Sequence, residues 1–422
     1  MTIRLNRTLP LLLAGAAFLG TAPAGAQSRQ TYVDLSAGVG YSTNPRLSAG
    51  DDVDSVFGRL SAFGAHSWQT ERSATQFSGF VETSFYGRGE PDSTEIFNLG
   101  ASTQYQASET VSVFGSASFS GDFGGQLSTR FLTAPFQPTA PATQVPPSQQ
   151  ATPALPAQPT VQLPPLTVTD PFLFGIQGRQ YQASLQAGLA IRPTEREQWN
   201  ISANLQRYFF SGSLNDQDYW VYGATAGYER QVSERSSAGL RVSVQRSDFS
   251  GGRATTFITP QATFRTRFSE VWDAQLAAGF TYTDEDSVVG DDQSFGLALD
   301  ASLCRALENQ RICARASRYN QNAGGATLLE TTSAGIDYSQ RLGEFDTLQL
   351  RADVVRSSGF EVLGQESAST YYTAAGTYSR RFGERLSGGI LVNARKLNQF
   401  GTDPKADVGG SVFLSYRLGD IR

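Results

Sequence analysis

The chain has 422 residues, of which 39% are hydrophobic and 17% are charged, and its formal net charge at pH 7 is −5. This acidic balance excludes nucleic acid as an expected partner, because binding to a phosphate backbone needs a basic surface. After residue 26 there is no run of 18 apolar residues, which excludes a helical membrane span.

Residues 1–26 have the three parts of a secretory signal peptide. Arg4 and Arg7 precede an apolar run over 9–19, and small residues at 24–26 suit cleavage. The mature chain then has 32 basic and 39 acidic residues, a net charge of 32 − 39 = −7. Export without a helical anchor leaves the periplasm, the medium or the outer membrane as destinations.

A glutamate returns at a nearly constant interval. The positions are Glu71, Glu109, Glu195, Glu234, Glu270, Glu308, Glu344 and Glu384, in steps of 38, 86, 39, 36, 38, 36 and 40 residues. Half of them lie in a Ser/Thr/Gly-Glu-Arg run, as in 70–72 and 233–235. A repeat of this length is typical of a solenoid, a propeller or a strand array, so the residues between the glutamates decide.

Between these glutamates, apolar and polar residues alternate with the period of a β-strand. In 181–191, Tyr, Ala, Leu and Ile occupy one face, and Gln, Ser and Gly occupy the other. The alternation recurs in 97–106 and 407–418. The apolar face would line the core of a soluble sandwich, whereas in an outer-membrane barrel it faces lipid and the polar face lines the interior.

Two features favour the barrel. The polar face carries Gln, Ser, Gly and Thr where a soluble surface would carry Lys and Glu. The glutamate turns also alternate with longer connections, as the short periplasmic turns of bacterial barrels alternate with long outer loops. These predicted outer loops are 42–54, 87–94, 211–216, 248–253, 284–292, 320–327, 359–369 and 398–405.

Aromatic residues of the apolar phase gather near both strand ends, as interfacial girdles require. Near the glutamate turns are Trp68, Tyr105, Trp199, Tyr228, Phe268, Trp272, Tyr338, Tyr378 and Tyr416. Near the predicted loops are Tyr41, Phe85, Tyr181, Trp220, Tyr222, Tyr282 and Tyr372.

The sequence therefore predicts an all-β protein, a transmembrane up-and-down antiparallel barrel of about 18 strands (16–18) over 27–422, with both termini in the periplasm. Closure requires the first strand, 32–41, to pair with the last, 406–418. A barrel this wide leaves an aqueous lumen unless loops fill it.

The segment 122–172 interrupts the repeat and is predicted to be the third outer loop. The stretch from Gly121 to Phe172 holds 11 of the 18 prolines, with no charged residue over 133–169. Such a composition does not bury a core. The segment is either a constriction loop inside the pore or a solvated surface tether, and the tether is the favoured interpretation.

The two cysteines, Cys304 and Cys313, flank the turn around Glu308. Residues paired across two strands come within bonding distance, and an exported protein meets an oxidising compartment. The sequence therefore predicts a structural disulfide, with two unrelated thiols as the alternative.

Catalytic chemistry is not indicated. The chain has one histidine, His66, no nucleophile motif, no glycine-rich phosphate loop and no Cys/His pattern with metal-ligand spacing. The acidic run 284–292 could hold calcium through clustered oxygens, but it lacks the EF-hand order, and a solvated loop is the default interpretation. We expect no enzyme activity, no metal and no cofactor.

Charged residues of the polar phase are predicted to line the pore: Arg59, Glu82, Arg241, Arg265, Arg267, Asp273, Arg315, Asp337, Arg351, Asp353 and Arg395, together with Asp300, Asp407 and Arg417. Opposed charges across a lumen select solutes. The alternative is that they form ion pairs between neighbouring strands, such as Arg351 with Asp337. Inward aromatics, among them Phe114 and Tyr208, could stack on sugar rings.

Basic residues of the apolar phase lie near the predicted outer loops, where lipid headgroups are expected: Arg207, Arg318, Arg356 and Lys396. Their charge suits contact with lipopolysaccharide phosphates. Outer-membrane lipid and lipopolysaccharide are therefore expected partners.

The run Gly40-Tyr41-Ser42-Thr43-Asn44-Pro45, after the first strand, resembles the opening of outer-membrane β-barrel proteins of exopolysaccharide operons, which carry Gly-Tyr-x-x-Asn-Pro/Val there. The resemblance implies assistance in polysaccharide export, with periplasmic export partners. The chain departs from the usual barrel ending, because Gly-Asp-Ile-Arg follows Leu418 where an aromatic is expected. We expect a channel for polysaccharide or another polar solute; the alternative is a non-conducting structural or adhesive barrel whose proline-rich loop contacts surface partners.

Overall fold

The structure is a computed structural model, and it describes residues 28–45, 47, 54–87, 93–122, 178–212, 218–250, 252–287, 290–323, 327–362, 365–399 and 405–420. The predicted signal peptide, 1–26, and the proline-rich segment beyond residue 122 lie outside the described residues. Among the described residues, no helix is long and apolar enough to cross a membrane.

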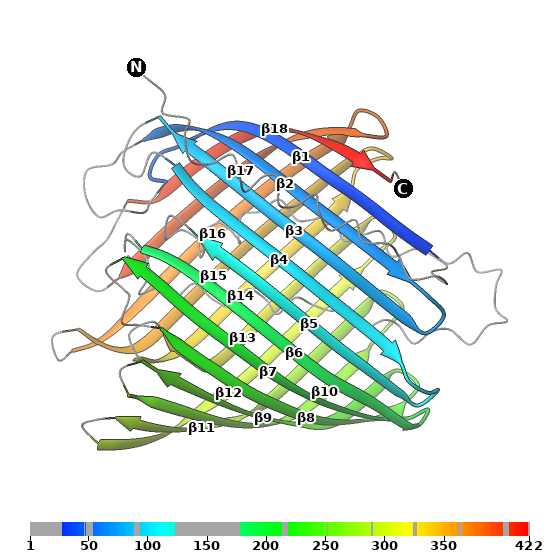
Figure 1. The fold of residues 1–422 in the computed structure, drawn as a ribbon, viewed down its shortest axis with the longest axis vertical. Helices are drawn as coiled ribbons and strands as arrows, with labels where there is room; N and C mark the ends of the chain where they lie inside the picture. Colours follow the sequence, from blue (N-terminus) through cyan, green and yellow to red (C-terminus); the bar gives the residue numbers. More distant parts are fainter. Residues whose placement is uncertain are drawn as a thin grey trace.

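The described residues form 18 antiparallel strands in one closed sheet, tilted against the barrel axis (Figure 1). The strands are β1 (Ser28–Ser42), β2 (Ser55–Gln69), β3 (Ser73–Tyr86), β4 (Ser93–Gln106), β5 (Val111–Asp122), β6 (Gly178–Thr194), β7 (Glu197–Gly212), β8 (Tyr219–Ser233), β9 (Ser236–Phe249), β10 (Ala254–Arg267), β11 (Trp272–Ser287), β12 (Gly290–Ala306), β13 (Gln310–Ala323), β14 (Thr327–Arg341), β15 (Asp346–Val362), β16 (Gln365–Arg381), β17 (Leu386–Gln399) and β18 (Asp407–Gly419). This confirms the predicted all-β barrel and its strand number.

The barrel closes between its first and last strands, as predicted. β1 pairs with β18 antiparallel, from Tyr32 opposite Gly419 to Ser42 opposite Gly409. Each strand also pairs with its neighbour in sequence, so the sheet has no free edge. Both ends of the described chain therefore lie at the same end of the barrel.

All eight repeating glutamates lie in or beside the turns at that end, which we call the turn end; the opposite end is the loop end. For example, Glu234 lies between β8 and β9, and Glu384 between β16 and β17. The 36 to 40 residue period is thus one rising and one returning strand with their two connections.

The predicted contrast between short turns and long loops is wrong for several connections at the loop end. Only two residues separate β11 from β12 and β15 from β16, although 284–292 and 359–369 were predicted to be loops. β9–β10 and β13–β14 are similarly close. These segments resemble loops in composition, although the backbone pairing continues to Ser287 opposite Gly290 and to Val362 opposite Gln365.

The outward face is a belt of exposed apolar side chains. Leu60, Leu240 and Leu414 are 55%, 64% and 57% exposed, and comparable residues occur around the barrel. Predicted girdle aromatics belong to this face, including Trp199, which packs 4.7 Å from Tyr228 between ring centroids. A bilayer covers such a surface and water does not, so the barrel is of the transmembrane kind.

Candidate functional site

The lumen wall consists of the side chains that alternate with the apolar belt. The predicted pore-lining residues all have this inward phase: Arg59 alternates with Val56 and Leu60, and Arg241 with Leu240 and Val242, which are exposed outward. Their contact with a solute stays a prediction. Their surroundings divide them into three groups.

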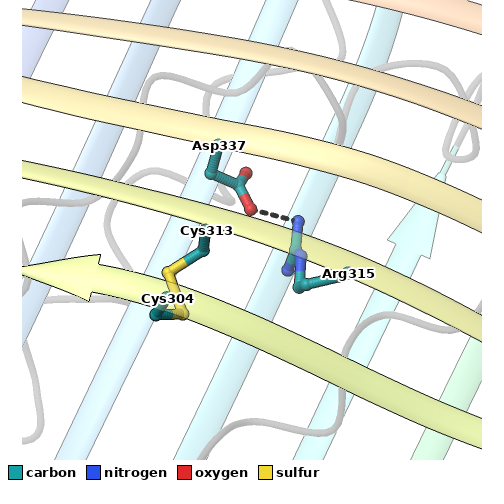
Figure 2. The surroundings of a disulfide bond; sticks show 4 residues. All are labelled: Cys304, Cys313, Arg315 and Asp337. Atoms are coloured by element: carbon teal, nitrogen blue, oxygen red, sulfur yellow. Dashed lines mark ion pairs between the residues drawn. A yellow bond between two sulfur atoms is a disulfide. The ribbon is translucent and has the colours of Figure 1, made fainter. Parts of the chain in front are cut away.

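The first group is an ion-pair ladder across β13, β14 and β15. Arg315 lies 2.6 Å from Asp337 (Figure 2), and Arg351 lies 3.7 Å from the same carboxylate. Asp353 lies 2.5 Å from Arg351 and 3.9 Å from Arg315. Two arginines and two aspartates balance, so the ladder stabilises the wall and adds no net charge to the lumen.

The disulfide lies beside this ladder. Cys304 on β12 and Cys313 on β13 are directly opposite each other and are bonded (Figure 2). Cys313 is in turn opposite Asp337 on β14. The bridge therefore fixes the β12–β13 hairpin at the level where the ladder begins.

The second group consists of further ion pairs between neighbouring strands. Arg59 on β2 lies 3.4 Å from Glu82 on β3, whose carboxylate is buried. At the closure seam Arg417 donates Nε and Nη2 to Asp34, each at 2.7 Å, and its guanidinium lies 4.4 Å from the centre of the Tyr32 ring. The interpretation of lumen charges as cross-strand ion pairs therefore describes a large part of the set.

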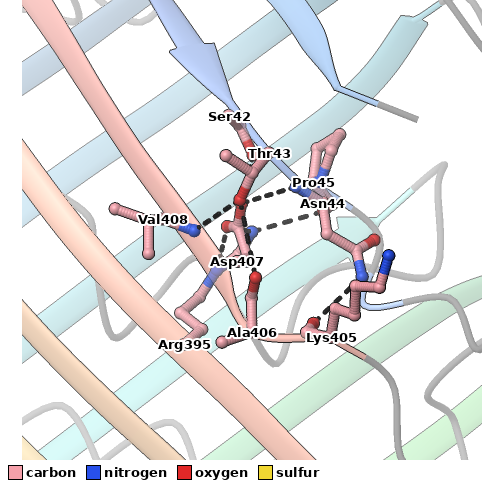
Figure 3. Close-up of polar contacts among 9 residues, drawn as sticks. All are labelled: Ser42, Thr43, Asn44, Pro45, Arg395, Lys405, Ala406, Asp407 and Val408. Atoms are coloured by element: carbon pink, nitrogen blue, oxygen red, sulfur yellow. Dashed lines mark hydrogen bonds and ion pairs between the residues drawn. The ribbon is translucent and has the colours of Figure 1, made fainter. Parts of the chain in front are cut away.

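Arg395 and Asp407 form a buried pair at the loop end of the seam (Figure 3). Arg395 Nε donates to Asp407 at 2.9 Å, Nη2 bonds the same carboxylate oxygen, and Nη2 also donates to the Pro45 carbonyl at 3.3 Å. The Arg395 side chain is 8% exposed and that of Asp407 is 0% exposed. Arg395 was predicted to line the pore, but burial keeps solutes from it.

The other oxygen of Asp407 holds the start of the first connection. It accepts from Ser42 Oγ at 2.5 Å and from the Asn44 backbone N–H at 2.9 Å. Asn44 Nδ2 donates to the Lys405 carbonyl at 3.1 Å. We call Ser42, Asn44, Arg395 and Asp407 the mouth anchor. Ser42 and Asn44 belong to the Ser-Thr-Asn-Pro part of the run that carries the family resemblance.

The connection continues inward from the mouth anchor. The Leu47 side chain is 5% exposed and packs with Tyr371 and Leu397 of the inner wall. Leu47 has a φ of 51°, a conformation that is strained for a leucine. Sequence reasoning missed this inward turn, because it assigned the whole of 42–54 to an outer loop.

Arg241 and Arg265 form the third group, because they bond side-chain amides. Arg241 donates to Gln261, and Arg265 to Gln275. Arg267 on β10 is opposite Asp273 on β11, yet no ion pair joins these two described residues.

Burial changes along the lumen. Inward hydroxyls near the loop end, Ser84, Ser247 and Thr331, are 0% exposed. Arg265 and Arg315, nearer the turn end, are exposed. Water therefore reaches the charged part of the wall, while the inner wall near the loop end is covered.

The outward basic residues at the loop end have unequal surroundings. The Arg207 guanidinium lies 4.8 Å from both the Phe209 and the Trp220 ring centres, which leaves its charge unpaired by these contacts. Arg318 Nη2 donates to Glu330 at 2.7 Å, which offsets its charge.

Comparison with known proteins adds similarities of low identity. No family model matches the chain, and no curated protein matches it. The FrpB iron transporter of Neisseria meningitidis (F3-3 variant) is similar with a TM-score of 0.47 and 8% identity over 89% of this chain, which spans 63% of the transporter. OccK2 (OpdF) of Pseudomonas aeruginosa gives 0.45 and 10%, covering 93% of this chain and 98% of that one. A BenF-like porin of Pseudomonas fluorescens Pf-5 gives 0.44 and 9%, covering 94% and 100%.

Proposed function

We propose that the protein is an outer-membrane channel for polar solutes. The observation that carries this proposal is the exposure of Arg265, Arg267 and Arg315 on the inner face of a closed barrel of 18 strands. Charged side chains inside a lipid-covered barrel need water, and a barrel of this width has room for it. Lipid and lipopolysaccharide surround the belt in this proposal.

We further propose that a polysaccharide is among the solutes. The inner face of β4 to β7 supports this, because its described middle part is neutral and rich in amides and hydroxyls, including Gln182 and Asn204. Phe114 and Tyr208 add ring faces on that wall. Amides bond sugar hydroxyls and rings pack on sugar faces, and the family resemblance, with its periplasmic export partners, agrees with this substrate class.

A non-conducting structural or adhesive barrel is the second candidate, and one observation favours it. Phe210, Tyr219, Val221 and Phe249 form a buried cluster on the inner wall near the loop end, and Tyr208 packs against it. This cluster and the mouth anchor are buried groups on the inner wall near the loop end, as a blocked lumen would require.

Conductance separates the two candidates. The refolded protein is inserted into planar bilayers, and current is recorded alone and with dextran or alginate. A channel gives discrete steps that the polysaccharides interrupt. If no current flows under any condition, the channel proposal fails and the structural barrel remains.

A further inference from the structure

Two arginines of the lumen wall are oriented by neutral amides. Arg241 on β9 donates Nε and Nη2 to the side-chain oxygen of Gln261 on β10, at 3.1 and 2.6 Å. Arg265 on β10 donates the same two groups to the side-chain oxygen of Gln275 on β11, both at 3.1 Å, in the amide orientation that satisfies both residues. The same arrangement thus occurs twice, shifted by one strand.

Carboxylates occupy the equivalent place beside three other arginines of the lumen wall. Arg351, Arg395 and Arg417 each use Nε and Nη2 to bond an aspartate. Those pairs are neutral, whereas an arginine held by glutamine keeps its full positive charge. Within the described part of the chain, neither Arg241 nor Arg265 forms an ion pair.

The free edge of each guanidinium fits a carboxylate. Arginine has five N–H donors, and the glutamine oxygen occupies the Nε edge. The edge formed by Nη1 and Nη2 remains, and its two parallel N–H groups match the two oxygens of a carboxylate. Arg265 is exposed and Arg241 is partly exposed, so a solute in the lumen can reach both.

Small residues separate the two arginines. The row between them consists of Gly239, Thr263 and Ala277, which are opposite one another on β9, β10 and β11. A Cβ on Gly239 would lie 2.1 Å from the Tyr228 carbonyl oxygen, so this position excludes a larger side chain. Gln261 and Arg265 are four residues apart on β10, which sets the two charges about 14 Å apart along the wall.

We propose that Arg241 and Arg265 are two successive binding stations for carboxylate groups of an acidic saccharide, on the β9–β11 wall. The saccharide as transported solute rests on the proposed channel function; the binding itself does not. The arginines bind, and Gln261 and Gln275 orient them without neutralising them. The stations would favour acidic over neutral sugars on this wall.

The test exchanges the amides for carboxylates of the same size. Full-length refolded protein in detergent is titrated with galacturonate, and with galactose as the neutral match, by saturation-transfer NMR. In Q261E/Q275E the arginines remain but are neutralised, and galacturonate should bind about tenfold more weakly, because a charge-assisted hydrogen bond is lost. R241Q/R265Q should show the same loss. The matched control R59Q/E82Q removes an ion pair of zero net charge and should bind as wild type.

Three outcomes would overturn the proposal: unchanged galacturonate binding in Q261E/Q275E, an equal loss in R59Q/E82Q, or stronger binding of inorganic phosphate than of galacturonate. Reversal potentials in a KCl gradient give a second readout. Both station variants should become more cation-selective than wild type, and the control should not. If the protein does not conduct at all, the channel proposal fails, while the NMR titration still decides the stations.

Discussion

Removing the carboxylate of Asp407 tests the mouth anchor most directly. In D407A the guanidinium of Arg395 stays buried with no opposite charge, since its side chain is 8% exposed. Breaking a buried ion pair by removing one partner costs about 3 to 5 kcal/mol of unfolding free energy. D407N keeps the shape and one acceptor oxygen, so its cost is expected to be lower, about 1 to 3 kcal/mol.

The same change should release the start of the first connection. The Asn44 backbone N–H donates to Asp407 at 2.9 Å, and the Val408 N–H donates to Thr43 Oγ1 at 2.8 Å. Losing a charge-assisted hydrogen bond should speed amide exchange around Asn44 by about 10 to 100 fold. Hydrogen exchange with mass spectrometry on peptides covering 40–47 measures this, and chemical denaturation of the refolded barrel measures the unfolding free energy.

D34N is the matched control. Asp34 bonds Arg417 on the same seam, near the turn end, and forms no hydrogen bond or ion pair with the described residues of the first connection. D34N should lower the unfolding free energy and leave exchange at Asn44 unchanged. The reasoning is refuted if D407A costs less than about 1 kcal/mol, or if D34N accelerates exchange at Asn44 as much as D407A does.

Three other changes give separate checks. C304S/C313S should lose about 2 to 3 kcal/mol of unfolding free energy, because the bridge closes a short loop with a sequence separation of 9. Alkylation of both thiols in the wild-type protein without prior reduction would show that no bridge forms. R351M should cost about 1 to 3 kcal/mol in denaturant unfolding, since it leaves the two carboxylates Asp337 and Asp353 with Arg315 as their one cation in the ladder, and a neutral result would mean that the ladder does not stabilise the wall. R207E should reduce co-purified lipopolysaccharide measured by phosphate analysis, whereas R230E, outward at the turn end, should not; equal loss in both would contradict a specific headgroup contact.

Local sequence rules predicted the barrel because its strands obey one alternation throughout. The two faces differ in polarity in every strand, so period 2 identifies both the secondary structure and the side of the wall on which Arg241 or Leu240 lies. The turn glutamates identify the strand ends at the turn end. The cysteine pairing follows from the same counting, because Cys304 and Cys313 flank one turn.

The loop end was predicted less well. Near 287 and 362 the composition resembles that of loops, although the backbone pairing of β11 with β12 and of β15 with β16 continues. The inward turn after Ser42 was also missed, because its partners on β17 and β18 lie 350 and 365 residues away in sequence.

By itself, the sequence determined that this is a closed barrel of about 18 strands, on which side of the wall each strand residue lies, and which charges face the lumen. Only the tertiary structure decided what those charges do. The side of the wall on which a side chain lies is set by alternation within one strand, whereas the neutralisation of its charge depends on which residue is opposite on the next strand. That register leaves Arg395 buried against Asp407, places Arg351 opposite Asp337, and places glutamines beside Arg241 and Arg265.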